Sequence, residues 1–172
     1  MPADAKTHTI QRVPLNIASY CLIAWCKSLL HKLVSMATTG RAHAPENEAD
    51  AELREVFFAE LADVTRSLQQ ACANWRRHPT DAAALKNLRR GFHTLKGSAP
   101  LVGASALSDF SSHLEQLIAR VLEQRLVATT DLIVTVEQAI ALLPAFAVAI
   151  RDARSAPAKA RSVDSKVQRF LS

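Results

Sequence analysis

Hydrophobic residues recur every three or four positions through four long segments of this chain, and this periodicity constrains the fold more than any other feature of the sequence. The segments cover about residues 47–77, 81–102, 104–124 and 129–150. Each would form a helix whose apolar stripe must be buried against other helices. Because no segment shows a convincing strand alternation and the links are short, the sequence predicts an all-α, up-down-up-down four-helix bundle.

Capping residues and prolines predict where these helices begin, bend and end. Either Thr80 or Asp81 is a natural N-cap for the second helix. Pro100 lacks the N–H that would bond to the carbonyl of Lys96, so we expect a kink or a stop near the end of that helix. Pro144 should bend the fourth helix or divide it in two.

The two ends of the chain differ from the bundle region, which we place at residues 46–153. Residues 1–45 form a basic segment in which an apolar stripe between Val13 and Leu33 predicts a possible extra helix. A packing helix is our first interpretation and a basic interfacial helix is the alternative, whereas polar side chains interrupt the stripe too often for a membrane span. Residues 154–172 are rich in Ala, Ser, Lys and Arg, and we expect a flexible basic tail there.

The positive charge of the chain is concentrated in these two ends. The formal net charge of the 172 residues is +5, made up of +4 in residues 1–44, −3 in residues 45–153 and +4 in residues 154–172. Together with the small number of aromatic residues, this distribution argues against nucleic-acid binding. Three cysteines without CxxC spacing favour a reduced, cytoplasmic compartment in which each serves as a small apolar residue.

One histidine has surroundings that point to chemistry. The apolar stripe of the second helix passes through Phe92 and Leu95, so His93 lies about 100° away from it. Its neighbours on the same helix face are four cations and a glycine: Lys86, Arg89, Arg90, Lys96 and Gly97. The cations would attract an anionic partner and hold phosphate oxygens. A glycine inside a helix costs about 1 kcal/mol relative to alanine, and here it would leave a gap where another protein could approach the imidazole.

The residues around this histidine resemble the histidine phosphotransfer (Hpt) domain family. The resemblance rests on a His-x-x-Lys-Gly core followed, at the family's spacings, by a Gly, a Leu and a Leu-Glu pair: His93, Lys96, Gly97, Gly103, Leu107, Leu114 and Glu115. It covers about residues 46–152 and implies the four-helix bundle that the periodicity also predicts. Within the family, segments 74–77, 88–98 and 141–144 look most like the phosphotransfer modules of type IV pilus (twitching) chemotaxis kinases.

The resemblance implies a role for each residue of the core. His93 would be the phosphoacceptor, Lys96 would interact with the phosphoryl oxygens, and Gly97 would provide clearance. In chemotaxis-type members a Glu at the position of Glu115 accepts a hydrogen bond from the second ring nitrogen and so holds the tautomer. We expect the partner-binding surface to include four further residues: Lys86, Arg89, Arg90 and Ser98.

Two neighbouring positions bear on what else the site could hold. Ser112 stands where chemotaxis-kinase relatives often carry another histidine, and the adjacent His113 is turned about 100° away, which argues against a second imidazole in the site. Asp109 and His113 are i, i+4 neighbours that could form half a metal site. Because no third ligand is evident, we predict no metal site in this chain.

The resemblance implies a phosphorelay intermediate that carries a phosphoryl group between a histidine kinase and the aspartate of a receiver domain. The chain has no glycine-rich phosphate loop and no Walker lysine motif, so we expect the ATP-binding kinase domain to lie elsewhere. We expect no cofactor on this chain, with Mg²⁺ supplied by the receiver, and a cytoplasmic protein, with membrane association of the N-terminal segment only if that segment is the alternative interfacial helix. The alternative is a docking module that binds a receiver or a kinase without being phosphorylated.

Overall fold

The computed structural model describes residues 46–172, and within that range every regular element is a helix. The elements are α2 (Glu46–Arg77), α3 (Ala82–Ser98), the 3₁₀ helix η1 (Ala99–Val102), α4 (Ser105–Leu122), α5 (Thr130–Ala141), α6 (Leu143–Arg151) and α7 (Ala158–Leu171). The all-α fold class is therefore confirmed. The extra helix expected within residues 1–45 lies outside the described residues.

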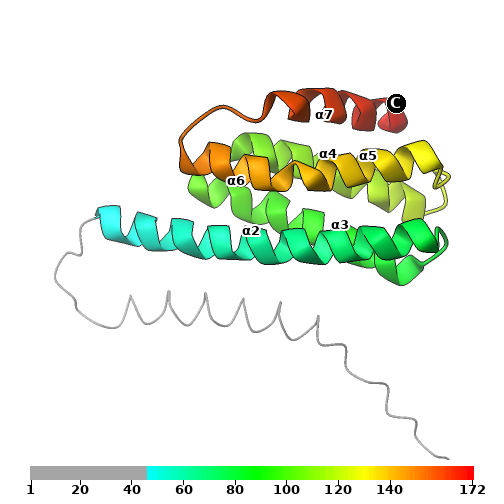
Figure 1. Cartoon of the computed structure of the whole chain (residues 1–172), viewed down its shortest axis with the longest axis horizontal. Helices are drawn as coiled ribbons and strands as arrows, with labels where there is room; N and C mark the ends of the chain where they lie inside the picture. Colours follow the sequence, from blue (N-terminus) through cyan, green and yellow to red (C-terminus); the bar gives the residue numbers. More distant parts are fainter. Residues whose placement is uncertain (1–45) are drawn as a thin grey trace, which may run out of the picture. The chain divides into compact units, whose positions relative to one another are not determined.

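Helices α2, α3 and α4 and the consecutive pair α5–α6 form the bundle, in which α5 and α6 together take the place of a single helix (Figure 1). Helix α3 packs against both α2 and α4, and the α5–α6 pair closes the bundle against α2. The largest side chains with almost no exposure come from α2, α3 and α6: Trp75, Phe92 and Phe146. The indole Nε1 of Trp75 donates to the carbonyl of Pro79 at 3.2 Å, so its polar atom is paired within the bundle.

The helix boundaries fall where the caps and prolines predict them. Asp81 caps α3, since its Oδ1 accepts from the backbone N–H groups of Ala83 and Ala84 at 2.8 and 3.1 Å. Helix α3 stops at Ser98, one residue before η1, which contains Pro100. The expected division of the fourth helix is also present, because α5 ends at Ala141 and α6 begins at Leu143, beside Pro144. Both proline predictions are confirmed.

The close approach of α2 and α3 depends on Gly91. A Cβ atom added at Gly91 would lie 2.6 Å from Cδ2 and 2.9 Å from Cγ of Leu68 on α2. Leu68 is fully buried in the core, so its side chain has little room to move aside. A side chain at position 91 would therefore push the two helices apart or distort the core.

Residues 154–172 do not form the flexible tail expected from their composition. Most of them form α7, which packs against α4 and α5 at the edge of the bundle away from α2 and α3 (Figure 1). Val163 and Val167 are buried in the common core. Two polar contacts also join α7 to α4: His113 Nδ1 lies 2.8 Å from Asp164 Oδ1, and the Arg120 guanidinium donates to the carbonyl of Leu171 at 2.6 Å. This part of the fold prediction is corrected: the tail is a fifth packed helix.

The α5–α6 pair is strongly apolar. The stretch Thr130–Arg151 is long and apolar enough, by length and composition, to cross a membrane. Half of its most apolar window is buried inside the bundle, where Leu132, Val136 and Ile140 contribute to the core. A core helix of this kind has the same composition, so the stretch is weak support for a membrane span.

Candidate functional site

His93 lies on the outward face of α3, as the position of the apolar stripe predicts. Its neighbours Phe92 and Leu95 are fully buried against the rest of the bundle, whereas 69% of the His93 side chain is exposed. Because α3 is a continuous helix from Ala82 to Ser98, packing on its inner face fixes the position of the imidazole on its outer face.

Helix α4 brings a carboxylate to this imidazole. Glu115 Oε1 lies 2.9 Å from His93 Nδ1, and Glu115 Oε2 accepts from the ammonium of Lys96 at 3.2 Å. The Glu115 side chain is only 13% exposed, while Lys96 stays 44% exposed beside it. The structure thus brings together three residues that the sequence singled out, from two helices that pack along their length.

The contacts of Glu115 keep it charged. Burial alone would raise the pKa of Glu115, but hydrogen bonds from His93 and Lys96, together with their positive charge, bring its pKa below the ordinary value of 4.5. An ionised carboxylate can only accept a hydrogen bond, so Nδ1 of His93 carries the proton toward Glu115. In the neutral imidazole this leaves Nε2 unprotonated, with a free lone pair.

The rest of the helix face around His93 is open and positively charged. A Cβ atom built on Gly97 would meet nothing within 4 Å, so this glycine leaves open space and does not serve close helix packing. Three exposed cations extend the surface toward the start of α3: Lys86, Arg89 and Arg90. Within residues 46–172, none of these three takes part in an ion pair.

Ser98, which we expected on the partner-binding surface, is placed elsewhere. It is 4% exposed, and its hydroxyl donates to the carbonyl of Thr94 at 3.1 Å. The physical reason is its position on the helix, which follows the buried stripe that includes Leu95. Ser98 is therefore a packing residue of α3, and its side chain is not available for contact with a partner.

The second histidine near the site is engaged on the other side of α4. His113 contacts Asp164 of α7, and Ser112 Oγ accepts a weak bond from Gln116 at 3.5 Å. Within residues 46–172 there is no group of three His, Cys, Asp or Glu side chains that could hold a metal ion. In the described part of the chain, His93 is therefore the imidazole that faces Glu115.

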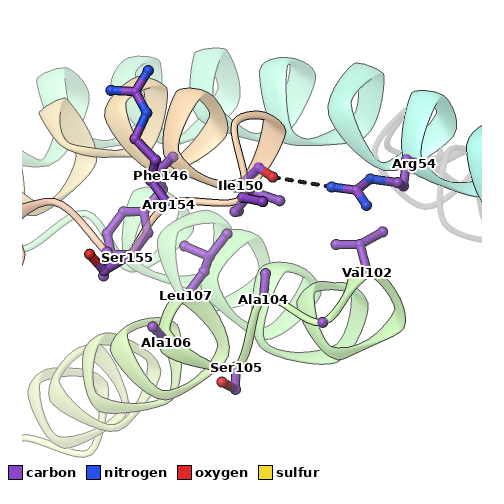
Figure 2. A pocket seen from close by; sticks show the side chains of 14 residues that line it. Arg54, Val102, Ala104, Ser105, Ala106, Leu107, Phe146, Ile150, Arg154 and Ser155 are labelled. Atoms are coloured by element: carbon purple, nitrogen blue, oxygen red, sulfur yellow. Dashed lines mark hydrogen bonds between the residues drawn. The ribbon is translucent and has the colours of Figure 1, made fainter.

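The surface of the described residues also has an open depression of about 400 Å³ (Figure 2). It is lined by the link between α3 and α4 and by the end of α6, with Val102, Leu107 and Phe146 among its walls. At its rim the Arg54 guanidinium donates to the carbonyl of Ile150 at 3.1 Å (Figure 2). None of His93, Lys96 and Glu115 lines it. The face that carries His93 is thus an exposed helix surface separate from this depression.

One contact at the site was not expected from the sequence. The hydroxyl of Ser108, near the start of α4, donates to the backbone carbonyl of Lys96 at 2.8 Å. The sequence feature that points to this contact is Pro100, which lacks the N–H that would otherwise bond to the Lys96 carbonyl. The sequence indicates that a donor is missing, but it does not indicate which residue of another helix replaces it.

Comparison with known families identifies a match over most of this bundle. The family model described as the Hpt domain matches residues 52–146, a range that includes α3, α4 and α5 and contains both His93 and Glu115. A comparison with curated proteins gives no match.

Proposed function

The chain belongs to the Hpt domain family, and from this premise we propose that it is a phosphorelay intermediate that carries the phosphoryl group on His93. Family membership implies a histidine phosphotransfer role in two-component signalling. The proposal goes further, because it names the acceptor residue, its supporting residues and a chemotaxis-like pathway.

The observation that carries the proposal is the contact of His93 with Glu115 on an otherwise open face. Glu115 lies 2.9 Å from Nδ1, which leaves Nε2 as the nucleophilic nitrogen. Lys96 lies within reach of the same carboxylate, and its flexible side chain can turn to phosphoryl oxygens near His93. Gly97 leaves room for the surface that delivers the phosphoryl group.

The transfer step follows from this arrangement. The Nε2 lone pair of His93 attacks the phosphorus of an aspartyl phosphate, the N–P bond forms, and the P–O bond to the aspartate breaks with its electron pair going to the carboxylate. The proton on Nδ1 stays on the ring, and the negative charge of Glu115 stabilises the positive charge that develops there. The reverse sequence of bonds returns the phosphoryl group to an aspartate.

Hpt domains generally interact with histidine kinases and receiver domains. We propose that the receiver supplies the acidic pocket and Mg²⁺ for this chain and that the kinase supplies ATP. The exposed cations Lys86, Arg89 and Arg90 would steer an acidic receiver surface toward His93, so association should weaken as salt rises. Such a relay would operate in the cytoplasm.

The pathway we propose is chemotaxis-like, of the type IV pilus kind. Two features support it: the likeness of segments 74–77 and 88–98 to such modules, and the contact between Glu115 and His93, which the resemblance to chemotaxis-type members leads one to expect. Measuring transfer from a panel of kinases and receivers would test this point, because a pilus-type partner should be the fastest donor.

The direct test is labelling of the purified chain by phosphorylated receivers and by autophosphorylating kinases. We expect acid-labile, base-stable phosphate on the wild type and none on His93→Gln, with the helix content of the variant unchanged. His78→Gln is the matched control, since His78 is an exposed histidine outside the site and its variant should be labelled normally. Persistent acid-labile label in His93→Gln would overturn the assignment of His93. Receiver binding without any label in the wild type would favour the docking module.

A further inference from the structure

The face of α3 that carries His93 and Lys96 ends where α3 passes into η1, at Ser98 and Ala99. Inside an α-helix the carbonyl of each residue accepts from the N–H four positions later, and for Lys96 that position is Pro100. Pro100 has no N–H to donate, and the chain passes from α3 into η1 at this point. The backbone that carries Lys96 and precedes Gly97 therefore lacks one of the hydrogen bonds that hold a helix rigid.

Helix α4 supplies the missing donor. Ser108 Oγ donates to the carbonyl of Lys96 at 2.8 Å, a good length for a hydroxyl donor. Ser108 and Glu115 are seven residues apart on α4, which is about two turns, so they lie on the same face of that helix. Lys96 is thus held at two points by α4: Ser108 binds its backbone carbonyl and Glu115 binds its ammonium at 3.2 Å.

We propose that Ser108 is a positioning residue for phosphotransfer, because its hydroxyl replaces the N–H that Pro100 removes and so fixes the last turn of α3 against α4. This inference rests on the proposed function of His93. Ser108 does not touch the reacting atoms; it acts through Lys96 and through the distance between the helices that carry His93 and Glu115. Without it, the last turn of α3 is free to shift relative to Glu115.

The test uses four variants of the full chain: Ser108→Ala, Ser108→Thr, Pro100→Ala and the double variant Pro100→Ala/Ser108→Ala. We expect Ser108→Ala to lower the transfer rate at saturating phosphorylated receiver about tenfold, with little change in the receiver concentration for half-maximal rate. Ser108→Thr keeps the hydroxyl and should retain transfer. In the double variant the alanine N–H at position 100 can bond to Lys96, so the loss caused by Ser108→Ala should be largely recovered. Ser105→Ala, an exposed serine of the same helix turn, is the matched control.

A second readout does not depend on transfer. Nuclear magnetic resonance of the unphosphorylated chain should show the Lys96 carbonyl shift change in Ser108→Ala and return in the double variant, together with a changed signal of the His93 Nδ1 proton. A rate and spectrum of Ser108→Ala equal to those of the wild type, or no recovery in the double variant, would overturn the role of Ser108. If the wild type itself accepts no phosphate, the proposed function fails, and the spectra still decide whether Ser108 positions this face.

Discussion

At the scale of single residues, Glu115 pairs with Nδ1 of His93 and leaves the other ring nitrogen, Nε2, without a partner on that carboxylate. Its carboxylate is mostly buried, accepts from Nδ1 and from Lys96, and keeps a lowered pKa because these contacts outweigh the effect of burial. A shift of this sign is also a statement about stability, since the folded chain holds the ionised form more strongly than the unfolded chain does.

We expect Glu115 to stabilise the fold above its ordinary pKa of 4.5 and to lose that contribution as the pH falls through its lower folded-state pKa. The free energy of unfolding, measured with urea from about pH 7 to about pH 3, should therefore differ between wild type and Glu115→Gln mainly at the upper end. Asp109→Asn, an exposed carboxylate change on the same helix, is the control. A difference that grows toward acid pH would contradict the lowered pKa.

Gly97 should matter for partner approach and not for folding. A Cβ at this position meets nothing within 4 Å, so Gly97→Ala should raise helix stability by up to about 1 kcal/mol. The bulkier Gly97→Val should reduce transfer by about tenfold or more, because its methyl groups occupy the space beside His93. Thermal unfolding and transfer rates measured on both variants test this separation. Unchanged transfer in Gly97→Val would count against docking over this face.

At this scale, the sequence predicts those site residues whose relative positions are set within a single helix. The spacing of His93, Lys96 and Gly97 is intrinsic to α3, so their common face could be predicted from their numbers alone. Glu115 lies on another helix, and it was expected only because of the family resemblance. Ser108 could not be predicted, since its contact with Lys96 depends on the register between two packed helices. Ser98 was misplaced because a polar residue type does not show that its position is buried.

At the scale of elements, the α2–α3 contact depends on the absence of a side chain at Gly91. Alanine there would gain about 1 kcal/mol of helix propensity, but its Cβ would lie 2.6 Å from Leu68, and overpacking of a core costs about 1–3 kcal/mol. We therefore expect Gly91→Ala to lower the free energy of unfolding by about 1 kcal/mol. In a Leu68→Ala background the same change should no longer be unfavourable. Urea unfolding of the wild type, the two single variants and the double variant gives the coupling free energy between positions 68 and 91. Purely additive changes in the free energy of unfolding would contradict the close contact.

The ends and breaks of the helices were the most predictable features of the fold. Asp81, Pro100 and Pro144 act through their own backbone or the first turn beside them, so their effects can be inferred without knowing the tertiary structure. Helix α7 could not be found in this way. Its apolar positions recur three or four residues apart, at Ala160, Val163, Val167 and Phe170, but this stripe is short and lies in a segment rich in basic and small polar residues. Its burial comes from packing against α4 and α5, and contacts between helices far apart in the sequence cannot be read from one segment alone.

At the scale of the whole molecule, α7 makes the folded unit longer than the family match, which ends at residue 146. Val167 lies on the inner face of α7 and is fully buried, so Val167→Ala should lower the free energy of unfolding of the bundle by about 2 kcal/mol. Ser165→Ala, on the exposed face of α7, should change it by less than about 0.5 kcal/mol. Chemical unfolding with a probe in α3 measures both. If Val167→Ala and Ser165→Ala both left the free energy of unfolding unchanged, residues 154–172 would be a flexible tail after all.

Burial across the bundle also affects Cys72, the cysteine among the described residues. Cys72 lies in the core, where burial raises the pKa of its thiol to about 12, with the negative charge of Glu137 acting in the same direction. A protonated, buried thiol neither attacks a phosphoryl group nor reacts readily with oxidants. The Cys72 thiol is therefore not expected to compete with the exposed His93 as the proposed phosphoacceptor.

The position of His93 on an exposed helix surface has a consequence for which protein surfaces can reach it. A cleft selects its ligands by shape, whereas an open helix face can contact any protein surface that fits flat against it. Under the proposed function, the same face would serve donors and acceptors in turn, and neither would need the other to be present. Under the same proposal, discrimination between partners would come from the residues that surround the imidazole, such as Lys86, Arg89 and Arg90, and changes there would alter which partners bind.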